Sequence, residues 1–388
     1  MSSQEHNSEF GLSPEIKANQ RIYYEYFDED FAKALSVHVA QFLTDNYFRS
    51  SEEGFENLPK RNNPNRPLIY ISNHSGMAFP WDGIIMSSRF LQVADGKFKN
   101  GIRPLAAPLL SQSALMNPYL VENLWKRVGA LDATFLNFET MLHYNDSNLM
   151  LYPEGIAGIG KGYNHKYELQ RFSSSFVYNS IKYKTDVMSV LTVNGENINP
   201  YSYSIPWINK LSNMVGIPFV PIGLLTPFLL IQPWLFYFSF PAKLVFVMGK
   251  RYKPYEMTNK SVDELSRDEL KNMAEEIRLD MQKDLDAAVE THGREPYSYR
   301  EHFSVLLKNW RLFPYTVPHA WPFLMSEFER AWKNHTETGE EMKLDLSWGS
   351  TIRIFLRDPF IISFYLPILG WIPILLKGLW RNTVGSKS

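Results

Sequence analysis

The 388-residue chain contains no cysteine, which excludes disulfide bonds, thiolate nucleophiles and cysteine-bound metals. It has no excess of charge either, because 40 Lys and Arg residues nearly balance 41 Asp and Glu residues. Since nucleic-acid binding needs an excess of cationic groups that release counterions, we expect no nucleic-acid partner. The N-terminus, MSSQEHNSEFGLSPEIK, lacks the apolar core of a secretory signal, so none is predicted.

Common catalytic patterns are missing as well. The chain has no GxGxxG, HExxH or GxSxG motif, and histidines such as His143 and His165 show no ligand-like spacing. The run GIAGIGKG resembles a P-loop, but Gly162 occupies the place where a Mg²⁺-binding hydroxyl is needed. We therefore expect no catalytic metal and no ordinary serine hydrolase.

Long apolar runs are present, but prolines interrupt them. Residues 211–242 contain no charged side chain and are long enough to cross a bilayer at a rise of about 1.5 Å per residue. Five prolines lie within them, however, and each costs about 3 kcal/mol inside a helix. We therefore predict an irregular apolar surface and not a membrane span. The prolines are Pro218, Pro221, Pro227, Pro233 and Pro241.

Residues 359–376 are a second uncharged segment that is broken in the same way. Basic residues flank both of its ends, and such flanks are typical of the cytoplasmic side of a membrane. A shallow hairpin that turns near 367–370 keeps both flanks on that side, whereas a single crossing does not. We expect a membrane-associated, monotopic protein on the cytoplasmic leaflet, with the 211–242 surface on the same face. The interrupting residues are Pro367, Gly370 and Pro373, and the flanking ones are Arg357, Lys377 and Arg381.

The remaining chain alternates between strand-like and helix-like segments. Continuous apolar strands between amphipathic helices predict an α/β fold with a largely parallel sheet flanked by helices. We expect N-terminal helices in residues 1–60, this α/β domain in 61–292, and an apolar extension in 293–388. Strands are predicted at 67–72, 149–155, 187–195 and 242–250, and helices at 14–49, 81–94, 168–183 and 261–289.

The stretch IYISNHSGMAFPWDG, residues 69–83, contains the first candidate site. His74 follows a buried-looking strand, and chemistry in open α/β sheets occurs at the carboxyl ends of strands. A histidine held by a carboxylate can take a proton from a hydroxyl at neutral pH. Asp82 is the only carboxylate within ten residues of His74. The alternative is a structural histidine that satisfies carbonyl groups of its loop.

A second candidate site lies in LMLYPEGIAGIGK, residues 149–161. A predicted strand delivers Glu154 and Gly155, and further glycines and Lys161 follow. Backbone amides in such a glycine-rich turn can bind an anion, and the lysine adds positive charge. The alternative is an ordinary glycine-rich turn with a solvated lysine.

Together these stretches resemble the glycerolipid acyltransferase superfamily, including lysophospholipid acyltransferases. SNHSGMAFPWDG is followed, in order, by LYPEGIAGIGK, YELQRFSSSF, VMSVLTVNGEN and FPAKLVFVMGKRYKP. The resemblance covers roughly residues 60–290 and is strongest to the branch with monoacylglycerol-acyltransferase-like bacterial proteins. It implies an α/β fold at a membrane surface, within lipid metabolism and phospholipid biosynthesis.

The resemblance also implies an activity. A fatty acyl chain would pass from an acyl-CoA or acyl-carrier-protein thioester to a hydroxyl of a glycerolipid-type acceptor, with no cofactor beyond that co-substrate. His74 would be the general base and Asp82 its orienting partner. The predicted substrate-binding residues are Asn73, Ser75, Gly76, Glu154, Gly155, Lys161 and Arg171.

Two departures from the family pattern sharpen these expectations. Seven residues separate His74 from Asp82, where the family usually has four. Ala157 stands where members that use phosphorylated acceptors carry an arginine. One lysine does not readily replace a bidentate arginine, so we expect a neutral acceptor unless Lys161 or Arg171 substitutes.

Two other functions fit the same residues. An acyl hydrolase or thioesterase could use the His74–Asp82 pair to activate water, although a hydrolase needs no acceptor-binding block. A lipid-binding protein at the membrane surface could keep the fold without turnover, although it would not need both side chains. The sequence does not indicate the acyl chain length or the oligomeric state.

Overall fold

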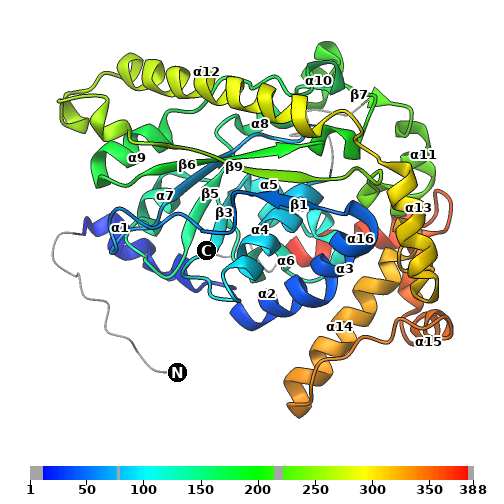
Figure 1. The fold of residues 1–388 in the computed structure, drawn as a ribbon. Helices are drawn as coiled ribbons and strands as arrows, with labels where there is room; N and C mark the ends of the chain where they lie inside the picture. The colour runs from blue at the N-terminus through cyan, green and yellow to red at the C-terminus, as the bar shows by residue number, and fades with distance from the viewer. Residues whose placement is uncertain (1–11, 77–78, 214–221, 383–388) are drawn as a thin grey trace.

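The computed structural model describes residues 12–76, 79–213 and 222–382. Its centre is a seven-stranded sheet with the order β1-β9-β6-β2-β5-β3-β4. Figure 1 shows this sheet between layers of helices. Neighbouring strands are parallel except β6 and β9, which are antiparallel. The predicted α/β fold with a largely parallel sheet is therefore confirmed. The strands are β1 (Ser51–Glu53), β2 (Ile69–Ser72), β3 (Ile102–Ala106), β4 (Leu131–Asp132), β5 (Asn148–Leu151), β6 (Val187–Val193) and β9 (Val245–Tyr252).

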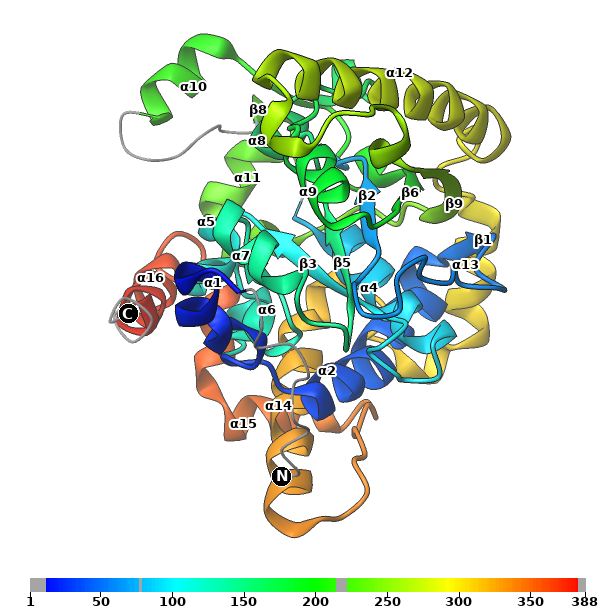
Figure 2. The same cartoon turned by 90° about the vertical axis from the view of Figure 1, so that its left-hand side faces the viewer.

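Helices cover both faces of the sheet, as Figures 1 and 2 show. They are α1 (Pro14–Asn19), α2 (Glu29–Leu35), α3 (Gln41–Leu43), α4 (Trp81–Val93), α5 (Pro108–Gln112), α6 (Leu124–Arg127), α7 (Phe135–Met141), α8 (Gly155–Ile159), α9 (Ser175–Tyr183), α10 (Pro206–Asn213), α11 (Thr226–Ile231), α12 (Arg267–His292), α13 (Tyr299–Lys308), α14 (Trp321–Thr338), α15 (Ser350–Arg357) and α16 (Trp371–Asn382). Three short 3₁₀ helices also matter below: η7 (Gly195–Ile198), η10 (Val262–Glu264) and η13 (Pro359–Phe364). A two-stranded ribbon pairs β7 (Ser202–Tyr203) with β8 (Ile222–Gly223).

The alternation of side chains along β2 divides the interior into two cores. Ile69 and Ile71 join one apolar cluster, to which α7, α9 and α12 contribute. Tyr70 points to the other face and joins a second cluster with residues of α2, α4 and α14. Because successive strand residues face opposite sides, a strand buried on both faces must be apolar throughout. This is why β2, β5 and β6 were recognisable in the sequence.

The start of α12 differs from the prediction by six residues. Ser261 and Glu264 do form a capping box, but it encloses only the short helix η10. A second box, Ser266 with Glu269, begins α12 at Arg267. Each box satisfies the free N–H groups of one helix start, so two boxes in succession produce two separate helices.

The three predicted segments share one core. Phe31, Tyr70, Trp321 and Ile374 come from all three and belong to the same apolar cluster. Strand β1 precedes the expected boundary at residue 60, yet it belongs to the sheet, where it pairs with β9 at one edge. The proline-rich stretch after it is therefore a loop between two strands of one sheet. Proline and asparagine favour turns both in a linker between domains and in a loop between two strands, so they do not distinguish the two.

No helix in the described ranges is long and apolar enough to cross a membrane. Residues 359–376 form η13, a turn, and the first half of α16. At the turn, an added Cβ on Gly370 would lie 1.9 Å from the carbonyl oxygen of Ser363, so only glycine fits. Of the predicted 211–242 surface, α11 is described, and residues 214–221 lie outside the described ranges.

Candidate active site

His74 lies just beyond the carboxyl end of β2, between the ends of β5 and β6. The preceding Asn73 fixes its position. The Asn73 side chain accepts a hydrogen bond from the Thr192 N–H at 2.8 Å and donates one to the Thr192 carbonyl at 2.9 Å. Asn73 is buried and fully engaged with β6 in this way. It positions the loop and does not present its amide to a ligand.

Glu154 holds the same loop from the other side. One of its carboxylate oxygens accepts the His74 backbone N–H at 2.8 Å, and the other accepts the Gln170 N–H at 2.7 Å. The carboxylate therefore ties the end of β2 to the segment before α9. The close approach of α8 requires glycine at position 158, where an added Cβ would lie 2.5 Å from Glu154 and 3.0 Å from the His74 ring.

The His74 ring stacks on Tyr152, with ring centroids 4.4 Å apart and planes inclined by 20°. The side chain is half-buried. Burial, and to a lesser extent the positive charge of Lys161, lower the pKa of His74 to about 3. The imidazole is therefore neutral at physiological pH, and one ring nitrogen carries a free lone pair.

Asp82 lies in the first turn of α4 and is buried. Burial raises the pKa of its carboxyl to about 6, although hydrogen bonds from the Ser75 hydroxyl and the Gly83 N–H oppose the shift. Within the described chain, no hydrogen bond or ion pair joins Asp82 to His74. Asp82 therefore contacts Ser75, whereas the sequence analysis predicted a contact with His74.

Tyr152 is close to both candidate catalytic residues. Its ring lies against His74, and the charge of Asp82 helps burial to raise the pKa of its hydroxyl. An added Cβ on Gly83, next to Asp82, would lie 3.4 Å from that hydroxyl. Tyr152 thus lies beside the imidazole and near the carboxylate. Sequence reasoning missed it, although it directly precedes the Pro-Glu-Gly block.

Lys161 is buried and paired with carboxylates. Its ammonium nitrogen lies 3.2 Å from Glu196 and 4.0 Å from Glu154, and it donates to the Glu168 carbonyl at 3.3 Å. The side chains of Lys161, Glu154 and Glu196 are at most 2% exposed. Glu196, in η7, also accepts the Tyr167 N–H at 3.0 Å. It was the second residue missed, because its partner lies 35 positions earlier in the chain.

The remaining predicted residues fall in two places. Gly76 and Gly155 border the cluster and have positive φ angles of 81° and 57°. Gly76 approaches Glu196, since an added Cβ would lie 3.6 Å from its Cγ. Arg171 is exposed. Lys271 lowers the pKa of Asp268 on α12 and Arg278 that of Glu275, and the charge of Arg171 adds a smaller effect to both. The structure thus gathers every predicted site residue around His74 except Arg171.

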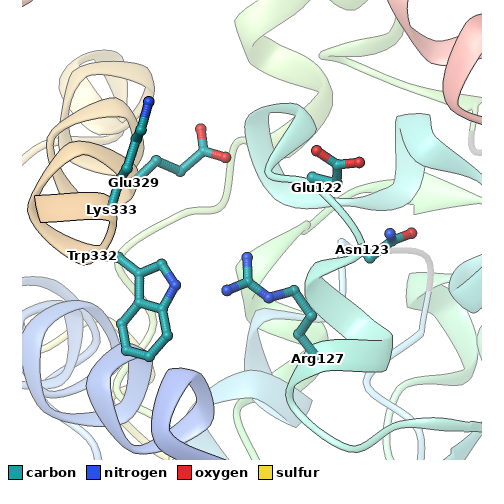
Figure 3. Close-up of a pocket in the computed structure, with 6 residues that line it drawn as sticks. All are labelled: Glu122, Asn123, Arg127, Glu329, Trp332 and Lys333. Atoms are coloured by element: carbon teal, nitrogen blue, oxygen red, sulfur yellow. The ribbon is translucent and has the colours of Figure 1, made fainter. Parts of the chain in front are cut away.

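Two further observations bear on ligands. Among the described residues, no three His, Asp or Glu side chains are grouped so that they could hold a metal ion. A hollow of about 490 Å³ lies between α6 and α14. None of the predicted site residues lines it, and Figure 3 shows the side chains that do. Its lining consists of Glu122, Asn123, Arg127, Glu329, Trp332 and Lys333.

Comparison with known proteins gives distant matches. No family model matches the chain. An uncharacterized protein of Mycobacterium tuberculosis is 25% identical over 202 residues, and one of Mycobacterium leprae is 26% identical over 203. These stretches are 52% of this chain and 52% and 51% of the relatives, so the chain spans about half the length of the curated relatives it matches.

A solved structure is similar in part. It is the 1-acyl-sn-glycerophosphate (LPA) acyltransferase PlsC from Thermotoga maritima, with 14% sequence identity and a TM-score of 0.37. The match covers 72% of this chain and 86% of that one. A TM-score below 0.5 is too low to assign a function, so the site is interpreted from this chain's own residues.

Proposed function

We propose that the chain is an O-acyltransferase that moves a fatty acyl group from an acyl-CoA or acyl-carrier-protein thioester to a lipid hydroxyl. The observation that carries this proposal is the neutral, half-buried imidazole of His74 at the carboxyl edge of the sheet. Its backbone is held by the carboxylate of Glu154, so its position does not depend on substrate. A fixed base of this kind lowers the entropy cost of reaching the transition state.

The reaction needs two proton transfers. A ring nitrogen of His74 accepts the proton of the acceptor hydroxyl while that oxygen attacks the thioester carbonyl. The tetrahedral intermediate then expels the thiolate, which takes the proton from the imidazolium. Because the surroundings lower the pKa of His74, its imidazole is a weak base in the first transfer, and its imidazolium is a strong acid that gives up the proton readily in the second. The imidazole is neutral again at the end, and ester and thiol are the products.

The acceptor we propose is neutral, such as a mono- or diacylglycerol. Lys161 is already paired with Glu196 and Glu154, and the charge of exposed Arg171 acts on Asp268 of α12. Among the described residues around His74, three carboxylates (Asp82, Glu154 and Glu196) are buried, and Lys161 is the one buried cation. A phosphate would meet repulsion here, whereas an uncharged hydroxyl would not.

The test is incubation of the purified chain with labelled acyl-CoA or acyl-carrier protein and a panel of lipid acceptors, followed by lipid separation. We expect labelled ester with neutral acceptors, and none with His74→Ala. His335→Ala, a histidine on α14 outside the site, is the matched control and should be active. Free fatty acid without ester would identify a hydrolase. Binding of lipid without either product would identify a non-catalytic lipid-binding protein.

A further inference from the structure

One side chain beside His74 keeps a hydrogen-bond donor that the site itself does not use. Tyr152 directly follows β5, and its ring is stacked on the imidazole at a centroid distance of 4.4 Å. Within the described ranges, no hydrogen bond engages the Tyr152 hydroxyl. The polar side chains around it are occupied, since those of Asn73, Glu154 and Lys161 each have partners. The phenol is therefore the side-chain donor of this group that is left for a ligand.

The position of this phenol does not depend on a ligand. The Tyr152 ring is half-buried and packs against the apolar cluster that contains Tyr70 and Trp81. Its plane is inclined by only 20° to that of the imidazole, and α8 approaches the Cδ2 edge of the imidazole at Gly158. The base and the donor thus lie side by side on a rigid support. Donors that are preorganised in this way need no rearrangement during the reaction.

The phenol also keeps its proton at physiological pH. Burial, and then the charge of Asp82, raise the pKa of the Tyr152 hydroxyl well above its ordinary value. This hydroxyl therefore does not compete with His74 as the base, and its role is that of a donor. Although the charge of Asp82 acts on it, no hydrogen bond joins the two side chains in the described part of the chain. A hydroxyl hydrogen rotates to suit its acceptor, so it can turn toward another negative oxygen.

Acyl transfer creates such an oxygen. When the acceptor hydroxyl attacks the thioester carbonyl, the π electrons of that carbonyl move onto its oxygen, and His74 takes the hydroxyl proton. We propose that the Tyr152 hydroxyl donates a hydrogen bond to this oxyanion and is thus a catalytic residue. The phenol keeps its own proton throughout. When the carbonyl forms again, the carbon–sulfur bond breaks, and the thiolate takes the proton from His74. The proposal rests on the proposed function, because it assigns a further residue to the same reaction.

The first experiment measures turnover by Tyr152→Phe, which keeps the stacked ring and removes only the hydroxyl. We expect kcat to fall roughly 10²–10³-fold, as is typical for the loss of one oxyanion donor. The KM should be nearly unchanged, because the contact forms only in the transition state. The matched control is Tyr70→Phe, which removes another hydroxyl that has no partner in the described structure, from inside β2. It should turn over normally, and thermal unfolding shows whether both variants are folded.

The second experiment measures binding and needs no turnover. It uses two acyl-pantetheine analogues, because pantetheine carries the thiol of both coenzyme A and acyl-carrier protein. One is a phosphonate with a charged tetrahedral centre like that of the intermediate, and the other is a thioether without the carbonyl oxygen. Tyr152→Phe should weaken phosphonate binding at least about tenfold and leave thioether binding unchanged. This result decides on Tyr152 even where the lipid assay identifies a hydrolase and so contradicts the proposed function.

Four outcomes would overturn the proposal. A normal kcat in folded Tyr152→Phe would show that another donor meets the oxyanion. A raised KM at normal kcat would show a contact with the bound substrate and not with the intermediate. A loss of turnover that Tyr152→Phe no longer causes once Asp82 is replaced by Asn would show that the hydroxyl acts through Asp82. Failure of the unchanged chain to bind the phosphonate more tightly than the thioether would show that the site does not stabilise an oxyanion.

Discussion

Around His74 ionisable side chains are buried, whereas on α11 and around the start of α16 aliphatic side chains are exposed. Asp82, Glu154, Lys161 and Glu196 are each nearly inaccessible, yet Leu369 is 65% exposed. Both arrangements cost folding free energy. Burying a charged group removes it from water, and leaving an apolar side chain exposed forgoes the stabilisation that its burial would bring. The site offsets part of its cost by internal ion pairs and hydrogen bonds. The exposed aliphatic side chains have no such compensation among the residues that the structure describes.

The comparison also separates two kinds of sensitivity. Substitutions in the buried cluster should act on catalysis or on stability according to which pair they break. Substitutions of exposed aliphatic residues such as Leu369 should change neither. The four predictions below test the buried cluster and its limit at exposed Arg171, from the largest expected effect to the smallest.

The largest effect is expected for His74→Ala. General-base help is worth roughly 10²–10⁴-fold in rate, so turnover should fall by that factor while the fold is kept. Steady-state rates and thermal unfolding of the same preparation measure both. Near-normal turnover would mean that another group removes the proton.

The next effect is expected for Lys161→Met. Removing the ammonium leaves Glu154 and Glu196 buried without a counter-charge, which costs about 3–5 kcal/mol of unfolding free energy. Unpaired carboxylates take up protons more easily, so the loss should be smaller at pH 5 than at pH 8. Urea unfolding at the two pH values measures it. The control is Lys166→Met, because Lys166 is exposed nearby. Equal stability of the two variants would contradict the pairing.

Asp82→Asn should stabilise the protein at alkaline pH. Burial raises the pKa of Asp82 to about 6 from 3.8, so the folded state binds this proton more tightly than the unfolded state does. Stability is therefore lost as pH rises from about 4 to 6, and the shift of about 2 units corresponds to about 3 kcal/mol. The variant should regain up to that amount at pH 8 and nothing at pH 4.

Activity measurements show whether Asp82 takes part in the reaction. If ionised Asp82 supports the imidazolium, turnover of the unchanged chain should fall below pH 6, and Asp82→Asn should be slow at every pH. Asp45→Asn, a substitution of an exposed residue, serves as the control for both measurements. A variant that is stabler and fully active would remove Asp82 from the reaction and leave it a structural partner of Ser75 and Gly83.

Much of the sheet could be predicted from the sequence. Strands β2, β5, β6 and β9 are apolar runs, and their alternation with helices indicates parallel neighbours. The nearness of His74 to the Pro-Glu-Gly block follows, because the carboxyl ends of adjacent parallel strands meet. Strands β1, β3 and β4 were missed. β1 and β4 are very short, and Arg103 and Pro104 interrupt the apolar pattern of β3.

The partners of the buried charges could not be predicted. Lys161 reads as a solvated lysine in its own stretch, and only the fold places η7 and Glu196 against it. The stacking of Tyr152 on His74 likewise depends on how two loops fold over the sheet edge. Hydrophobic periodicity identifies elements, but it does not specify which polar side chains meet where elements end.

The smallest effect is expected for Arg171→Ala. Arg171 is exposed, and its charge acts on Asp268 and Glu275 of α12 and not on the His74 cluster. Its removal should change the unfolding free energy by no more than about 0.5 kcal/mol, as for other surface positions. The ratio of kcat/KM for a neutral acceptor to kcat/KM for a phosphorylated acceptor should stay the same. If Arg171 bound the phosphate, its removal would lower kcat/KM for the phosphorylated acceptor alone. Measuring this ratio for Arg171→Ala and for Arg171→Lys therefore decides whether the substrate site extends to α12 or ends at the buried charges around His74.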